Sequence, residues 1–123
     1  MKVLIVDDEP LVRLSLKRAL EKSGHQVAEA ADGQIGMEVW RNFSPDLTFL
    51  DVLMPRITGP DLLKALRSAG AVTGKVILMS AFTGDYNLER AKSVGADLFI
   101  TKPFEDIFAV VKQGEELVRG KGK

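Results

Sequence analysis

Short apolar runs alternate with segments of helical periodicity along the whole chain, and this alternation restricts the possible folds most strongly. Most of the runs are rich in Val, Ile and Leu, as is typical of strands covered on both faces. They lie at residues 3–6, 26–30, 47–50, 75–80 and 98–100, and the second is polar enough for an edge strand. The helical patterns lie between residues 10 and 24, 33 and 44, 59 and 69, 86 and 94, and 105 and 118. Strands that alternate with helices pair in parallel through right-handed crossovers. We therefore predict an α/β fold: a single (βα)5 doubly wound domain, with a five-stranded parallel sheet and helices on both faces.

The length and composition are those of a single globular domain without disulfide bonds. The 123 residues include 17 Lys and Arg against 17 Asp and Glu, so no basic field favours nucleic acid or a membrane surface. The absence of Cys excludes disulfides and thiolate metal sites. The first apolar run ends at Asp7, too early for a signal peptide, and no run is long enough to span a membrane, so we expect a cytoplasmic protein. We expect residues 1–118 to form the domain and the basic residues 119–123 to be a flexible tail or a linker stub.

Polar residues follow four of the five apolar runs. They are Asp7 and Asp8, then Asp51, then Ser80, and finally Thr101, Lys102 and Pro103. Each group alone is ordinary, because an Asp that closes a strand is usually a turn former and Lys-Pro is usually a turn. The carboxyl ends of parallel strands meet at one edge of the sheet, however, where α/β folds bind their ligands. The residues together therefore predict one site.

Three carboxylates in one place repel one another unless a cation lies between them. Oxygen ligands without His or Cys indicate a hard ion, and few protein ligands with room for water favour Mg²⁺ over Ca²⁺, with Mn²⁺ as an alternative. A carboxylate beside Mg²⁺ and a lysine is equipped to accept a phosphoryl group. We expect Asp51 to be the nucleophile.

The chain resembles the receiver domains of two-component response regulators, from Met1 to about Val118. Four motifs carry the resemblance: Val-Asp-Asp-Glu-Pro at residues 6–10, Asp-Val-Leu-Met-Pro-Arg-Ile-Thr-Gly at 51–59, Leu-Met-Ser-Ala at 78–81 and Thr-Lys-Pro-Phe at 101–104. The resemblance implies the flavodoxin-like strand order 2-1-3-4-5 of the chemotaxis regulators in this family. It also implies a signalling module that catalyses only its own phosphotransfer and slow self-dephosphorylation.

The resemblance further implies how the acidic site works. Asp51 would be phosphorylated by the phosphohistidine of a histidine kinase or a phosphotransfer protein. Asp8, Asp51 and the backbone carbonyl of Leu53 would hold Mg²⁺, with Asp7 acting through a water molecule. Lys102 would contact the carboxylate and then the phosphoryl group, with a cis peptide bond to Pro103.

The same family pattern implies a switch and two docking surfaces. Ser80 would turn its hydroxyl toward the phosphoryl oxygens, and the ring of Phe99 would follow inward. A downstream protein or an output domain would bind the face formed by the fourth helix, fifth strand and fifth helix, near Tyr86, Lys92, Phe99 and Phe104. The kinase would meet the first helix. The protein would be a monomer or a phosphorylation-dependent dimer.

Leu53 and Phe82 are apolar at positions that flank the site in the family. A polar side chain there could position a hydrolytic water molecule. We therefore expect a long-lived phosphoryl group on Asp51.

Alternative functions stay open at this point. The chain could be the receiver fragment of a larger response regulator, with a DNA-binding element beyond Lys123. A Mg²⁺-dependent phosphohydrolase with an Asp nucleophile fits less well, because its second Asp lies two residues on and Asp7 and Asp8 are adjacent. A flavin carrier would need a phosphate-binding loop where Asp-Asp-Glu stands.

Two remaining features have structural interpretations. His25 lies in a turn after the first helix, and we interpret it as a surface residue. Gly114 weakens the last two turns of the final helix.

Overall fold

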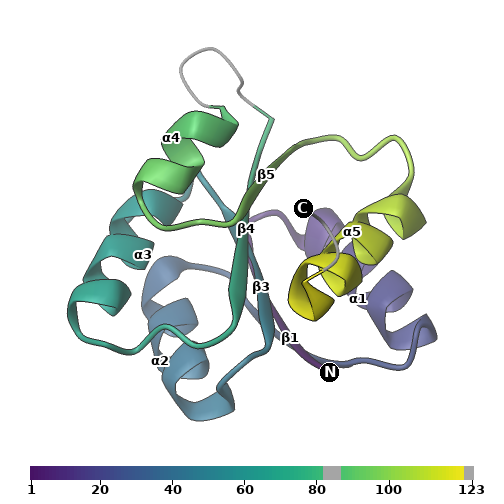
Figure 1. The fold of residues 1–123 in the computed structure, drawn as a ribbon, viewed down its shortest axis with the longest axis horizontal. Coiled ribbons are helices and arrows are strands. Elements are labelled where there is room, and N and C mark those ends of the chain that lie inside the picture. The colour runs from purple at the N-terminus through teal and green to yellow at the C-terminus, as the bar shows by residue number, and fades with distance from the viewer. Residues whose placement is uncertain (82–86, 121–123) are drawn as a thin grey trace.

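The protein is described here by a computed structural model that covers residues 1–81 and 87–120, in which five strands alternate with five helices (Figure 1). The strands are β1 (Lys2–Val6), β2 (Gln26–Ala30), β3 (Leu47–Asp51), β4 (Lys75–Ser80) and β5 (Leu98–Thr101). The helices are α1 (Pro10–Lys22), α2 (Gly33–Phe43), α3 (Gly59–Ser68), α4 (Leu88–Ser93) and α5 (Ile107–Arg119). All paired strands are parallel, in the order β2-β1-β3-β4-β5, which confirms the predicted fold class and strand order.

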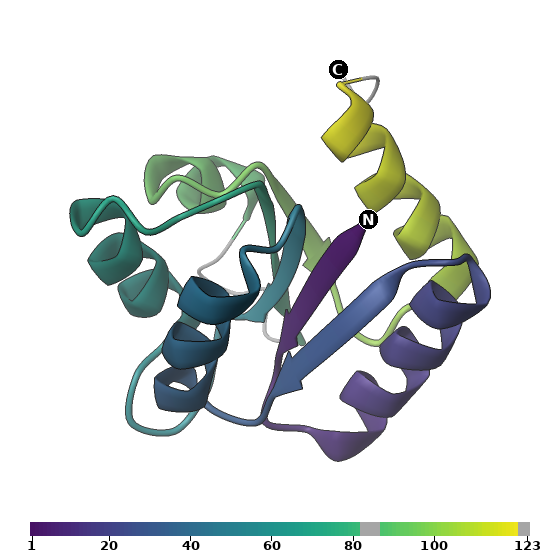
Figure 2. The same ribbon diagram turned by 90° about the horizontal axis from the view of Figure 1, so that it is seen from below.

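The sheet separates two hydrophobic layers, because successive strand residues point to opposite faces. Leu4 and Val6 pack with α2, α3 and α4, whereas Val3 and Ile5 pack with α1 and α5. Figures 1 and 2 show α2, α3 and α4 on one side of the sheet and α1 and α5 on the opposite side. The core is therefore covered on both faces, as the apolar runs predicted. Among the described residues no helix is long and apolar enough to cross a bilayer.

Side-chain caps account for four of the five helix starts among the described residues. Asp32 accepts the backbone N–H of Ile35 at 2.9 Å and begins α2. The final helix begins at Ile107, two residues later than its pattern suggested, because the Asp106 carboxylate accepts the N–H groups of Phe108 and Ala109. Such N-caps satisfy donors that have no partner inside the helix.

Gly114 has a packing reason that its sequence context did not reveal. It is buried, and a Cβ atom at this position would lie 2.6 Å from Cδ2 of Leu47 in β3. The glycine therefore lets α5 approach the central strand, and the helix continues through it to Arg119. The contact with the sheet outweighs the lower helix propensity of glycine.

The interpretation of His25 as a surface residue is wrong. Its side chain is only 12% exposed, and its Nε2 lies 2.6 Å from Oε2 of Glu115 in α5. Its Nδ1 lies 3.1 Å from the amino group of Met1. His25 therefore joins the turn after α1 to α5 and the start of β1.

Candidate functional site

Three carboxylates meet at the carboxyl edge of the sheet. Asp7 follows β1 and Asp51 ends β3, and these strands are neighbours, with Val6 paired to Leu50. One oxygen each from Asp7, Asp8 and Asp51 lie within 4.8 Å of one another. Asp7 and Asp51 are buried and Asp8 is exposed, so the cluster opens to solvent on one side.

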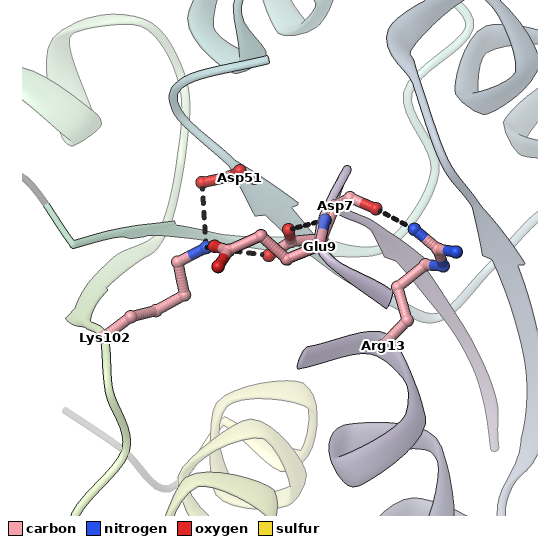
Figure 3. Close-up of polar contacts among 5 residues, drawn as sticks. All are labelled: Asp7, Glu9, Arg13, Asp51 and Lys102. Atoms are coloured by element: carbon pink, nitrogen blue, oxygen red, sulfur yellow. Dashed lines mark hydrogen bonds and ion pairs between the residues drawn. The ribbon is translucent and has the colours of Figure 1, made fainter. Parts of the chain in front are cut away.

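Lys102, which follows β5, brings a positive charge into this cluster (Figure 3). Its Nζ donates a hydrogen bond of 3.0 Å to Oδ2 of Asp7 and one of 2.6 Å to Oε1 of Glu9. The same nitrogen lies 3.4 Å from Oδ1 of Asp51. The peptide bond between Lys102 and Pro103 is cis, as predicted.

Burial perturbs the acidity of the two inner aspartates. It raises the pKa of Asp51 to about 7, with a further contribution from the negative charge of Asp7, against the opposing effect of Lys102. Burial also raises the pKa of Asp7, although the N–H of Glu9 and the Lys102 ammonium oppose this rise. One ammonium group thus neutralises these carboxylates only in part.

Burial has the opposite effect on the pKa of Lys102, because it disfavours the charged ammonium. Burial alone would lower it, but the hydrogen bonds to Glu9 and Asp7 outweigh burial and raise the pKa above its usual range. Lys102 is therefore a permanent cation in this site.

The donor set fits a hard divalent cation. It consists of carboxylate oxygens, which Mg²⁺ prefers, and the exposed side of Asp8 leaves room for water ligands. Additional positive charge between Asp7 and Asp51 would favour their ionised forms, against the burial that raises both pKa values and the charge of Asp7 that raises the pKa of Asp51 further. Asp7, Asp8 and Asp51 are thus the residues that could hold such an ion.

The remaining predicted residues are placed as follows. Ser80, at the end of β4, and Leu53 line a surface pocket of about 250 Å³ together with Asp51 and Lys102. Leu53 is 55% exposed, whereas Ser80 is buried. Phe99 is half-buried and packs against the layer formed with α2, α3 and α4. Phe82 and Tyr86 lie outside the described residues.

Sequence reasoning missed two residues that contact the site. Glu9 pairs with Lys102, and its own N–H donates to Oδ1 of Asp7 at 2.9 Å. Nη1 of Arg13 donates to the backbone carbonyl of Asp7 at 2.7 Å, and Nε of Arg13 pairs with Glu29 of β2 at 3.1 Å. Glu9 could have been suspected, because it continues the acidic pair. Nothing in the pattern around Arg13 pointed to the site.

A second, larger pocket adjoins the site. It has a volume of about 420 Å³ and is lined by α1 residues including Leu11, by Lys102 and Pro103, and by Phe104 and Ile107. The apolar side chains of Leu11, Leu14 and Phe108 are exposed by 76%, 43% and 54% on the same two helices, α1 and α5. Lys102 thus lines both pockets.

The chain is similar to known signalling proteins over most of its length. Residues 3–112 match the family model of the response regulator receiver domain. The transcriptional regulatory protein AfsQ1 of Streptomyces coelicolor is 32% identical over 119 residues, which cover 92% of this chain and 52% of AfsQ1. The chain spans about half the length of AfsQ1 and of several other transcriptional regulators that it matches. The chemotaxis protein CheY of Thermotoga maritima is 35% identical over 105 residues, which cover 85% of this chain and 87% of CheY.

Solved structures agree with this similarity. The receiver domain of the Francisella response regulator 1452 superposes with a TM-score of 0.87 at 29% identity, covering 97% of both chains. The chemotaxis protein CheY4 of Vibrio cholerae has a TM-score of 0.84 at 28% identity, covering 94% of this chain and 96% of its own.

Proposed function

The chain belongs to the response regulator receiver domain family of two-component signalling, and from this premise we propose that it is a phosphoacceptor switch. A histidine kinase or a phosphotransfer protein would donate the phosphoryl group to Asp51. The observation that carries the proposal is the buried carboxylate of Asp51 beside two further aspartates, 3.4 Å from the ammonium of Lys102.

The proposed reaction is an in-line phosphoryl transfer. A carboxylate oxygen of Asp51 attacks the phosphorus of the phosphohistidine, and an O–P bond forms as the N–P bond breaks. The imidazole leaves with the electron pair of that bond and takes up a proton. Lys102 stabilises the charge on the phosphoryl oxygens, as preorganised cations do in phosphoryl transfer.

We propose that Mg²⁺, or Mn²⁺ in its place, is the cofactor. Asp8, Asp51 and the backbone carbonyl of Leu53 would hold it directly, and Asp7 through water. When bound, the ion supplies further positive charge to the phosphoryl oxygens.

We propose that the output is a change in partner binding through α4, β5 and α5. A phosphoryl group adds charge and acceptor oxygens beside Ser80, whose hydroxyl would turn toward them. Phe99 belongs to the same layer as Ala91 of α4, so a movement of its ring would reach that helix. Lys92 would lie on the docking face. Phe104 instead lines the pocket beside α1, and Tyr86 is outside the described residues.

The partner on this face would be a downstream protein or an output domain of the same polypeptide. The transcriptional regulators that are about twice as long as this chain favour an output domain. Residues 1–118 would then be the receiver domain and residues 119–123 the start of a linker, although α5 itself extends to Arg119. The protein would be a monomer or a phosphorylation-dependent dimer. This segment itself would make no direct contact with nucleic acid.

We propose that the phosphoryl donor docks on α1 and the adjoining start of α5. The exposed side chains of Leu11, Leu14 and Phe108 offer an apolar contact surface there. A donor on this surface would place its phosphohistidine near Asp51, because Lys102 and Pro103 line the apolar pocket and Lys102 reaches Asp51.

We further propose that the phosphoryl group is long-lived. Leu53 lies at the pocket of Asp51 and offers no polar group to orient a water molecule. Phe82 would act in the same way, but it lies outside the described residues.

Intact mass after incubation with acetyl phosphate and Mg²⁺ tests the proposed function. Wild type and a control variant of an exposed aspartate, Asp61→Ala, should each gain about 80 Da, the mass of one phosphoryl group, and Asp51→Ala should gain none. Labelling of Asp51→Ala, or no labelling of the wild type, would overturn the proposal. Steady turnover of a generic phosphate ester would instead indicate a phosphohydrolase.

A further inference from the structure

Glu9 has no part in the proposed phosphotransfer, yet it makes the shortest contact with Lys102. Its Oε1 lies 2.6 Å from Nζ, compared with 3.0 Å for Asp7 and 3.4 Å for Asp51. The Lys102 side chain is 5% exposed and that of Glu9 is 57% exposed. Figure 3 shows Glu9 reaching the ammonium group together with Asp7 and Asp51.

The ammonium group has three hydrogens to distribute among these carboxylates. It donates to Asp7 and to Glu9, whereas its contact with Asp51 is the longest of the three. A phosphoryl group on Asp51 would bring further acceptor oxygens that need a hydrogen from Lys102. Two of the three hydrogens are already bonded to Asp7 and Glu9. A phosphoryl group that draws more than one hydrogen from Lys102 therefore competes with Glu9 for the same cation.

Charge repulsion acts in the same direction. Glu9 and Asp51 line the same pocket of about 250 Å³, so a phosphorylated Asp51 would face the Glu9 carboxylate. Like charges at short range disfavour each other. Release of Lys102 would let the exposed Glu9 side chain turn toward solvent.

We propose that Glu9 is a positioning residue that holds Lys102 in the unphosphorylated protein and must release it before Lys102 can engage the phosphoryl group. This contact between Glu9 and Lys102, called the latch below, weakens the interaction of Lys102 with the phosphoryl group. It therefore favours the unphosphorylated state. The proposal rests on the proposed phosphoacceptor function and adds a residue that tunes it.

Affinity for beryllofluoride, which takes the place of a phosphoryl group on a carboxylate, tests the latch. Three variants are compared with wild type by fluorine NMR at saturating Mg²⁺. Glu9→Gln keeps the length and removes the charge, whereas Glu9→Asp keeps the charge and shortens the reach. Glu38→Gln removes a charge from an exposed position on α2. The free energy of unfolding of each variant is measured in parallel.

We expect both Glu9 variants to bind beryllofluoride about fivefold more tightly, as suits a charge-assisted hydrogen bond with one exposed partner, and Glu38→Gln to match wild type. A change in stability alone would leave this affinity unaltered. Tighter binding by Glu9→Gln but not by Glu9→Asp would show an effect of charge without contact and overturn the latch. Unchanged binding by both variants would also overturn it, whereas a wild type that binds no beryllofluoride would refute the phosphoacceptor function itself.

Discussion

Asp51 should destabilise the metal-free fold that holds it, and its replacement by Asn should therefore stabilise the protein. The pKa of its carboxyl is about 7 in the folded state, against 3.8 for an unperturbed group, because burial and the charge of Asp7 disfavour ionisation. In the unfolded chain the group ionises near pH 4. Stability is therefore lost as the pH rises from about 4 to about 7. At about 1.4 kcal/mol for each pKa unit, full ionisation costs the folded state about 4 kcal/mol.

Urea unfolding at pH 5 and pH 8, without Mg²⁺, measures this cost. The single tryptophan, Trp40, is fully buried and reports unfolding by its fluorescence. Asn resembles the protonated carboxyl, so Asp51→Asn should gain about 2–4 kcal/mol over wild type at pH 8 and much less at pH 5. Asp61→Asn, on the exposed face of α3, should change little at either pH.

Two results would refute the reasoning. One is an Asp51→Asn variant no more stable than wild type at pH 8. The other is a gain of equal size at both pH values, because an effect of side-chain packing would not follow the ionisation of Asp51. Excess Mg²⁺ should reduce the gain at pH 8, since the proposed site binds the ion only with Asp51 present.

Three further predictions concern the packing next to Asp51, the docking of the phosphoryl donor and the lifetime of the phosphoryl group. Gly59→Ala should destabilise the fold by about 2–3 kcal/mol in urea unfolding, because the added Cβ would collide with the backbone carbonyl oxygen of Asp51; an unchanged midpoint would contradict this. Leu11→Glu should slow phosphotransfer from a histidine kinase at least tenfold but leave labelling by acetyl phosphate intact, and equal losses with both donors would count against docking on α1. Phe82→Glu should speed the decay of phosphorylated Asp51, measured by intact mass over time, and a decay rate equal to that of wild type would contradict the proposed role of apolar side chains.

The fold could be predicted from the sequence because its signals are local. Periods of two and 3.6 residues distinguish strands from helices, and Pro10 and Asp32 lie at helix starts as their chemistry suggests. The sequence pattern places the start of α5 two residues too early, because Glu105 and Asp106 are both acidic and only Asp106 caps the helix. The role of Gly114 cannot be predicted from local sequence, because its closeness to Leu47 depends on how α5 packs on the sheet.

The meeting of Asp7, Asp51 and Lys102 follows from parallel topology, which brings strand ends to one edge. The contact between Glu9 and Lys102 could not be predicted in the same way. It depends on the course of the loop after β1, where the N–H of Glu9 turns back to Asp7. The pairing of His25 with Glu115 joins residues 90 positions apart and leaves no local pattern.

Asp51, the proposed phosphoacceptor, and Lys102 lie at the ends of two strands that differ in burial. Every residue of β3 is buried, and the strand is bonded to β1 on one side and β4 on the other. β5 lies at the border of the sheet, with three half-buried residues and an exposed Thr101 immediately before Lys102. Backbone amides of β3 should thus exchange with deuterium only through global unfolding, whereas those of β5 can exchange through local opening. If the proposed latch operates, Lys102 would move between Glu9 and the phosphoryl group at the border of the sheet, while Asp51 would stay fixed at its centre.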